Sequence, residues 1–203
     1  MEIKEQANQS NGDKEKNKRD ATEVAEILGD KNVLKFVLDT NVILAYLSNN
    51  NPFHFEARTV IEGLKTKKIW FVMSYLVLGE FIANRDIIDK KLSVKKALDV
   101  FLKFDKGLDK RLIGGAPLNV NNIIDVYKKH TKHNKLTKAG FADFIILAEG
   151  CEIENSRILT CDKDMYSRGK SIFRDRIYYL PNQTKNIKSD YPRLMNEIQN
   201  NFK

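Results

Sequence analysis

The sequence has few of the residues that cross-link or interrupt a chain. Among 203 residues there are two cysteines, four prolines and one tryptophan. Cys151 and Cys161 are too few for a disulfide framework, and we expect both to be small core residues in a reducing compartment. The sequence shows no cleavable apolar leader, and no stretch approaches the roughly 20 apolar residues of a membrane span. A soluble, cytoplasmic protein without a membrane segment is therefore predicted.

The N-terminal end is also poor in large apolar side chains. Burial of the first twenty residues could not offset the entropy lost on ordering them. A short helix is expected at 21–28, ended by Gly29. We therefore divide the chain into a polar, flexible tail at 1–32, a folded domain at 33–183 and a C-terminal extension at 184–203, which is expected to be helical.

Positive charge is in excess and unevenly placed. The formal net charge is +8, but the first 32 residues hold six Lys or Arg against eight Asp or Glu, so the remainder carries +10. Such an excess indicates a polyanionic partner such as nucleic acid. A solubilising surface explains it about as well, so charge alone leaves both interpretations open.

Short apolar runs alternate with helical patterns along the domain. Strands are predicted at 33–38, 69–73, 157–161 and 177–180. Helices are predicted at 42–47, at 52–64, at 75–82 after a Ser74 cap, after a Ser93 cap, from Val120, and at 139–149, where Gly150 ends the helix. The Gly-rich cluster at 114–117 is expected to interrupt the pattern. This alternation predicts an α/β fold, a three-layer α/β/α sandwich with a mainly parallel central sheet.

Four acids occupy positions where such a fold concentrates its chemistry. Asp39 and Asp162 each directly follow a predicted strand, and the active crevice of an open parallel sheet lies beyond the carboxyl ends of its strands. Glu80 and Asp143 lie among apolar residues of predicted helices, where an ionised carboxylate is costly without a partner. A hard divalent cation, Mg²⁺ or Mn²⁺, is a suitable partner for several carboxylates. The pattern predicts metal-assisted phosphodiester hydrolysis.

Each acid alone also has a purely structural explanation. An aspartate after a strand often caps the next helix or forms a turn, which would account for Asp39 or Asp162. Glu80 and Asp143 could lie on exposed faces of their helices. Only the combination of the four acids favours a metal site.

Four segments of the chain resemble the PIN domain, and in particular the compact toxin-type ribonucleases exemplified by VapC. They are LDTNVIL at 38–44, LGEF at 78–81, FADFIILA at 141–148 and LTCDKDM at 159–165. Their order and the intervals of 41, 63 and 19 residues between successive acids fit that family. The segments span most of residues 34–180, so the resemblance implies a PIN-like nuclease domain at 33–183.

The resemblance also implies roles for individual residues. It implies an acidic catalytic pocket that binds Mg²⁺ or Mn²⁺ and is formed by Asp39, Glu80, Asp143 and Asp162. Asp39 and Asp143 are expected to be direct metal ligands, and Asp164 is a candidate fifth ligand. Small polar residues of the same motifs are expected to hold a carboxylate or a metal-bound water in place. These residues are Thr40, Asn41 and Thr160.

The implied activity is that of an endoribonuclease. It could be a toxin restrained by a cognate antitoxin protein or an enzyme of RNA maturation, and the chain is longer than the usual toxin-type member. A homodimer is also implied. The alternatives are a catalytically inactive PIN-fold module that binds RNA or acts as a scaffold, and a phosphatase of the haloacid-dehalogenase type. The phosphatase requires a second aspartate two residues after Asp39, where this chain has Asn41.

A basic segment, KKHTKHNKLTK at 128–138, precedes the helix that carries Asp143. We expect it to contact the RNA backbone, although a solvated basic surface is the ordinary alternative. The candidate RNA-binding residues are Lys128, Lys129, Lys132, Lys135, Lys138 and, five residues beyond Glu80, Arg85. His130 and His133 could instead suggest zinc, but no cysteine or third histidine lies nearby in the sequence.

Overall fold

The structure of the chain is a computed structural model. It describes residues 22–67, 69–89, 92–109, 111–115, 121, 124–125, 128, 141–181 and 191–200. Within these ranges no helix is both long and apolar enough to cross a membrane. Of the basic segment, only Lys128 falls within the described residues, where it is helical and exposed. Lys129, Lys132, Lys135 and Lys138 lie outside them.

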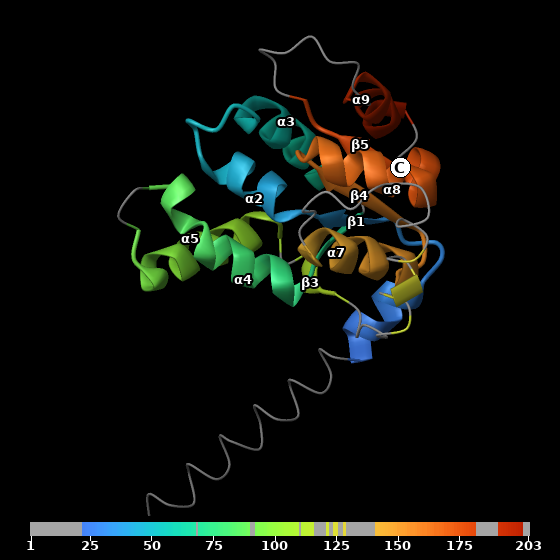
Figure 1. Ribbon diagram of the computed structural model, residues 1–203. Helices are drawn as coiled ribbons and strands as arrows, with labels where there is room; N and C mark the ends of the chain where they lie inside the picture. Colours follow the sequence, from blue (N-terminus) through green and yellow to red (C-terminus); the bar gives the residue numbers. More distant parts are fainter. Residues whose placement is uncertain are drawn as a thin grey trace, which may run out of the picture.

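A five-stranded parallel sheet forms the centre of the molecule (Figure 1). Its strands are β1 (Lys35–Leu38), β2 (Trp70–Met73), β3 (Leu112–Gly114), β4 (Ser156–Thr160) and β5 (Ile177–Tyr179). The spatial order is β3-β2-β1-β4-β5, and all four neighbouring pairs are parallel. Helices flank this sheet, so the predicted α/β fold with a parallel central sheet is confirmed.

At least one described helix separates each pair of successive strands along the chain. The helices are α2 (Thr40–Leu47), α3 (His54–Lys65), α4 (Tyr75–Ala83), α5 (Val94–Gly107), α7 (Phe141–Glu152), α8 (Lys163–Phe173) and α9 (Tyr191–Asn200). Two short 3₁₀ turns, Arg85–Ile87 and Arg174–Arg176, follow α4 and α8. Both predicted serine caps are confirmed: the hydroxyl of Ser74 accepts from the N–H of Leu76, and that of Ser93 accepts from the N–H of Lys96.

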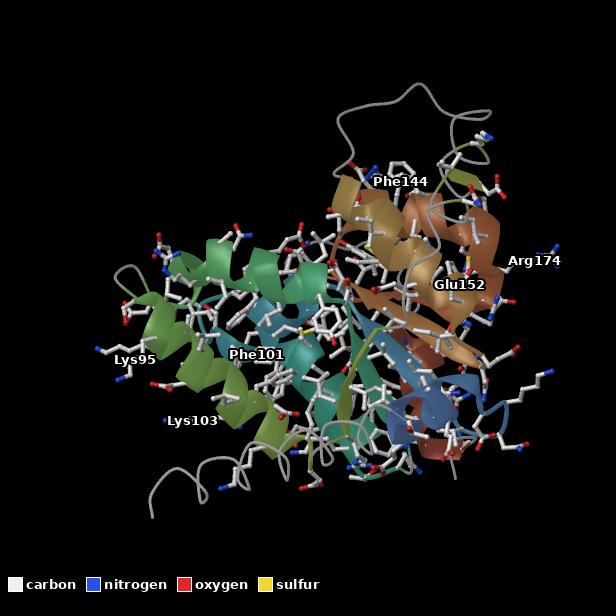
Figure 2. The ribbon with its side chains drawn as sticks, turned by 90° about the horizontal axis from the view of Figure 1, so that it is seen from below. Lys95, Phe101, Lys103, Phe144, Glu152 and Arg174 are labelled. Atoms are coloured by element: carbon white, nitrogen blue, oxygen red, sulfur yellow. The ribbon has the colours of Figure 1, made fainter. Side chains whose placement is uncertain are left out.

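The core lies on both faces of the sheet. All four residues of β1 are buried, which is typical of a central parallel strand covered by helices on each side. Phe101 of α5 packs in this core, at 5.5 Å between ring centroids from Phe81 (Figure 2). A further helix covers residues 22–29, and its Leu28 belongs to the same core.

One prediction about a glycine was wrong. Gly150 does not end its helix, because α7 continues to Glu152. A Cβ at Gly150 would lie 2.8 Å from Cδ1 of Ile158 and 3.0 Å from Cζ of Phe173, so the glycine allows close packing of α7 on β4 and α8. The 114–117 cluster does interrupt the pattern, because β3 ends at Gly114, but the strand β3 itself was not predicted. A three-residue strand is too short to show an apolar pattern.

The last described helix, α9, packs beside α3 and β5. Its Leu194 and Ile198 are buried. The Tyr178 hydroxyl of β5 donates to Oε2 of Glu197 at 2.5 Å, and the guanidinium of Arg193 lies 4.4 Å from the centre of the Tyr178 ring. These contacts hold α9 against the edge of the sheet.

Candidate active site

Asp39 and Asp162 lie at the carboxyl ends of two neighbouring strands. Asp39 follows β1, and Asp162 lies one residue after Cys161, which follows β4. Thr160 connects them: its hydroxyl donates to Oδ2 of Asp39 at 2.7 Å and accepts from the N–H of Asp162 at 2.9 Å. The pairing of β1 with β4 therefore places both acids at one edge of the sheet, as the sequence predicted.

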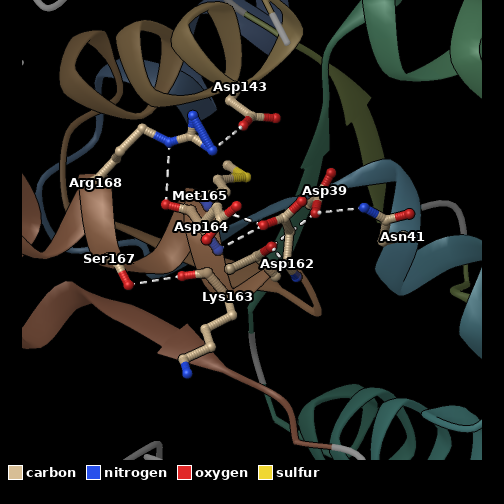
Figure 3. A network of polar contacts seen from close by, with 10 residues as sticks. Asp39, Asn41, Asp143, Asp162, Lys163, Asp164, Met165, Ser167 and Arg168 are labelled. Carbon is tan, nitrogen blue, oxygen red and sulfur yellow. Dashed lines mark hydrogen bonds and ion pairs between the residues drawn. The ribbon is translucent and has the colours of Figure 1, made fainter. Parts of the chain in front are cut away.

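The two other predicted acids reach this edge from helices. Glu80 lies on α4, and its Oε2 accepts from the Thr40 hydroxyl at 2.5 Å. Asp143 lies in the first turn of α7, and its Oδ2 is 3.1 Å from Nη2 of Arg168 on α8 (Figure 3). Each carboxylate is thus held by a side chain from another element.

The acids influence one another electrostatically. Burial raises the pKa of Asp39 to about 7, against the opposing effect of the Thr160 hydrogen bond. The neighbouring charges of Asp143, Asp162 and Glu80 raise that pKa further. Burial likewise raises the pKa of Asp143 to about 6, and Arg168 opposes this effect. Neighbouring carboxylates disfavour one another's ionised forms, whereas a bound cation would stabilise those forms.

The helix-cap explanation fits one aspartate and not the other. Oδ1 of Asp162 accepts from the N–H groups of Asp164 at 2.7 Å and Met165 at 2.9 Å, so this side chain caps α8. Asp39 also occupies the N-cap position of its helix, α2, yet its side chain makes no capping hydrogen bond. Instead it receives the Thr160 hydroxyl and, at 3.5 Å, Nδ2 of Asn41. Helix capping therefore leaves the buried carboxylate of Asp39 unexplained.

The donor set fits a hard divalent cation. It consists of carboxylate oxygens from two strand ends and two helices, supported by hydroxyl and amide groups. Among the described residues, no group of three or more His, Cys, Asp or Glu side chains is close enough to hold an ion as it stands. The chemistry of the donors, all of them oxygens, is that preferred by Mg²⁺ or Mn²⁺.

A family model of the PIN domain matches residues 36–170, which is more than half of the chain. The chain belongs to the PIN domain family. The match includes all four acids and Asp164, and it ends before α9. PIN domains are in general nucleases, so membership supports a nuclease-type function and confirms the resemblance noted in the sequence.

Three solved structures resemble the PIN fold of this chain at low identity. FitAcB from Neisseria gonorrhoeae is 16% identical, with a TM-score of 0.48 over 66% of this chain and 93% of that one. VapBC2 from Rickettsia felis, solved with a DNA fragment from the vapBC2 promoter, is 17% identical, with a TM-score of 0.48 over 70% of this chain and 93% of that one. A domain of a functionally unknown protein from Methanocaldococcus jannaschii DSM 2661 is 18% identical, with a TM-score of 0.47 over 77% and 97%. The comparison with curated proteins finds no match.

One predicted RNA-binding residue has a structural role in this PIN domain. Nε of Arg85 donates to the carbonyl of Leu92 at 2.8 Å, and Nη1 donates to the carbonyl of Ile82 at 3.0 Å. These bonds tie the end of α4 to the segment that precedes α5. No described contact joins Arg85 to the acids.

Sequence reasoning missed Arg168. It lies within LTCDKDMYSRGK, four residues after Asp164, and one turn of a helix brings such residues onto the same face. The arginine could have been found by extending the motif through the first turns of α8. Its contact with Asp143 depends on how α7 and α8 pack, which the sequence alone does not give.

Proposed function

We propose that the chain is a metal-dependent endoribonuclease that hydrolyses RNA phosphodiester bonds with Mg²⁺ or Mn²⁺. The observation that carries this proposal is the burial of the Asp39 carboxylate, which makes no helix cap, among the charges of Glu80, Asp143 and Asp162. Burying such a carboxylate without a cation is unfavourable. Membership of the PIN family supports the same chemistry.

Within this proposal the chain's own residues have distinct tasks. Asp39 and Asp143 hold the cation directly, and Glu80, Asp162 and Asp164 supply further oxygens to it or to its waters. Thr160 and Thr40 fix the carboxylates of Asp39 and Glu80 through the hydrogen bonds at 2.7 and 2.5 Å. A bound divalent cation supplies Lewis-acid stabilisation of the phosphate and activation of water for attack. No side chain is required as a covalent nucleophile.

The proposed substrate is RNA, bound through its backbone. The net charge of +8 supports a polyanionic ligand, and the basic segment at 128–138 precedes the helix that carries Asp143. Phosphate contacts of this kind provide affinity without sequence choice and weaken with salt. RNA affinity is therefore expected to fall steeply as salt concentration rises.

Cleavage of a pool of structured and single-stranded RNA tests the proposal. The purified chain is incubated with Mg²⁺, Mn²⁺ or EDTA beside two variants. One is Asp39→Asn, and the other is a control, Glu62→Gln, whose carboxylate is bound to Tyr46 and Lys65. We expect metal-dependent cutting by the wild type and by Glu62→Gln, and at least a hundredfold loss in Asp39→Asn. RNA binding without cutting in either metal would assign the chain to the inactive scaffolding module.

A protein partner is proposed for α5. Val94, Leu98 and Leu102 are exposed at 47%, 40% and 62% and form one stripe at helical spacing. Exposed lysines, among them Lys95 and Lys103, lie beside this stripe (Figure 2). Lysines outnumber the one exposed acid beside this stripe, Asp99, and such a surface fits an acidic amphipathic helix better than a second copy of this basic chain. The proposed occupant is a cognate antitoxin.

Complex formation tests this surface. Leu98→Glu/Leu102→Glu is expected to abolish binding of a small protein with an acidic amphipathic helix, where one is encoded next to this gene, and to leave RNA cleavage unchanged. The matched control is Lys31→Glu, which makes the same change in net charge at an exposed residue outside α5. If the chain alone forms a homodimer in sedimentation equilibrium and the double variant is monomeric, the stripe serves self-association instead. If no protein encoded next to the gene binds this chain, the result favours a role in RNA maturation in the cytoplasm.

A further inference from the structure

Arg168 reaches the acids from α8 and has two fixed contacts (Figure 3). Its Nη2 lies 3.1 Å from Oδ2 of Asp143 on α7, and its Nε donates to the backbone carbonyl of Asp164 at 3.0 Å. Its side chain is 13% exposed. The guanidinium therefore links α7 to α8 in a largely water-excluded position, where a hydrogen-bonded ion pair is strongly oriented.

The hydrogen bond from Arg168 to the carbonyl of Asp164 fixes the orientation in which its guanidinium meets Asp143. Because Nε is bonded to the carbonyl of Asp164 on the same helix, the plane of the guanidinium is fixed before it meets Asp143. A lysine ammonium is a point charge without this planar fork and could not make both contacts in the same geometry. Arg168 thus holds Oδ2 of Asp143 and leaves the other oxygen of that carboxylate for a further ligand.

We propose that Arg168 is a positioning residue of the metal site: it orients the Asp143 carboxylate so that the oxygen it does not hold is available to the cation. This inference rests on the proposed function. Metal-binding carboxylates are commonly hydrogen-bonded on the oxygen that faces away from the metal, and loss of such a partner typically costs about 10–100-fold in metal affinity. Arg168 has this relation to Asp143.

Charge alone makes the opposite prediction. A cation beside a ligand repels a divalent ion, so removal of a mere counter-ion would strengthen metal binding. The two roles differ in sign, and direct measurement of Mn²⁺ affinity separates them without any reference to RNA cleavage.

The experiment measures Mn²⁺ binding to the full chain at neutral pH, from the loss of the electron paramagnetic resonance signal of free Mn²⁺. Arg168→Met removes both the positive charge and the planar guanidinium. Arg168→Lys keeps the charge but removes the guanidinium, and Lys163→Met is the matched control. Lys163 is exposed on the same helix and points away from the acids (Figure 3). We expect both Arg168 variants to bind Mn²⁺ at least about 10-fold more weakly, and Lys163→Met to stay within about twofold because exposed charges are screened.

Three outcomes would overturn the inference. Equal or tighter Mn²⁺ binding by Arg168→Met would make the arginine a counter-ion, and wild-type affinity in Arg168→Lys would show that charge suffices. In both cases the proposed function stands, since the wild type still binds metal. No Mn²⁺ binding by the wild type would overturn the proposed function itself and the role of Arg168 with it. Thermal unfolding in EDTA verifies that each variant is folded.

Discussion

At the scale of single residues, Thr160 is the side chain on which the geometry of the site most depends. It is fully buried, and its hydroxyl bonds both to Oδ2 of Asp39 and to the N–H of Asp162. Burying a hydroxyl costs little free energy when the hydroxyl is hydrogen-bonded, and the Thr160 hydroxyl makes both of these bonds.

Thr160→Val should weaken metal binding more than it weakens the fold. The variant keeps the shape of the side chain but removes the donor to Asp39, so the pKa of Asp39 rises further and its carboxylate loses its fixed orientation. We expect about 10-fold weaker Mn²⁺ binding and a loss of about 1–2 kcal/mol in the free energy of unfolding. Calorimetric titration and urea denaturation measure the two. Thr160→Ser keeps the hydroxyl and should retain wild-type metal affinity.

Two buried acids, Asp39 and Glu149, and the half-buried Asp143 give the metal-free protein a defined pH dependence. Burial raises the pKa of Asp39 and of Glu149 to about 7 and that of Asp143 to about 6. A carboxyl with a raised pKa in the folded state contributes stability that is complete below its unfolded pKa, near 4, and is lost as pH rises through the folded pKa. In EDTA, the contribution of these groups to stability should therefore decrease between about pH 4 and pH 7.

Thermal unfolding checks that sign. At pH 8 in EDTA, Asp39→Asn is expected to unfold roughly 4–8 °C above the wild type, as expected for about 2 kcal/mol in a domain of this size. Glu149→Gln measures how much Glu149 contributes to this loss of stability, since Glu149 is hydrogen-bonded to Ser74 and is not one of the proposed metal ligands. Mn²⁺ should raise the melting temperature of Glu149→Gln but not of Asp39→Asn. A wild type more stable in EDTA at pH 8 than Asp39→Asn would contradict the pKa assignment.

At the scale of elements, the position of α7 sets the position of Asp143. This helix packs on β4 through Gly150, where Ile158 and Phe173 leave no room for a side chain. Close packing at a helical glycine fixes the distance between the helix and the sheet, and so fixes where the first turn of α7 presents its acid.

Gly150→Ala should therefore destabilise the protein despite the better helix propensity of alanine. The new Cβ would lie 2.8–3.0 Å from buried side chains, and overpacking of a core costs about 1–3 kcal/mol, against roughly 1 kcal/mol gained from propensity. Urea denaturation measures the net loss. Gly79→Ala is the matched control, because nothing lies within 4 Å of a Cβ there, and it should be neutral or stabilising. A stabilised Gly150→Ala would contradict the packing described for α7.

The helix α9 is part of the folded unit rather than an appendage. Leu194 is fully buried between α9 and the rest of the core, so Leu194→Ala should lower the free energy of unfolding by about 2–4 kcal/mol. Asn196→Ala, on the exposed side of the same helix, should change it by less than about 0.5 kcal/mol. A Leu194→Ala variant as stable as the wild type in urea would show that α9 does not contribute to the core.

At the scale of the whole molecule, the sequence predicted the features that depend on local residue patterns. Buried strands with apolar runs and acids at their ends were predicted from the residues, and the fold class is confirmed. It missed β3, which is three residues long, because so short a strand carries no periodicity. It also missed Arg168, because its contact with Asp143 joins residues of two helices whose packing no local pattern encodes.

The central claim is that the acids at this edge of the sheet bind one divalent cation or more. A crystal grown with Mn²⁺ and measured for anomalous scattering tests it most directly. We expect an anomalous peak at the separation of about 2.1 Å typical of small hard cations from oxygens of Asp39 and Asp143, with Arg168 still on the opposite oxygen of Asp143. Density for Mn²⁺ only elsewhere on the chain, with the four carboxylates unchanged, would contradict it.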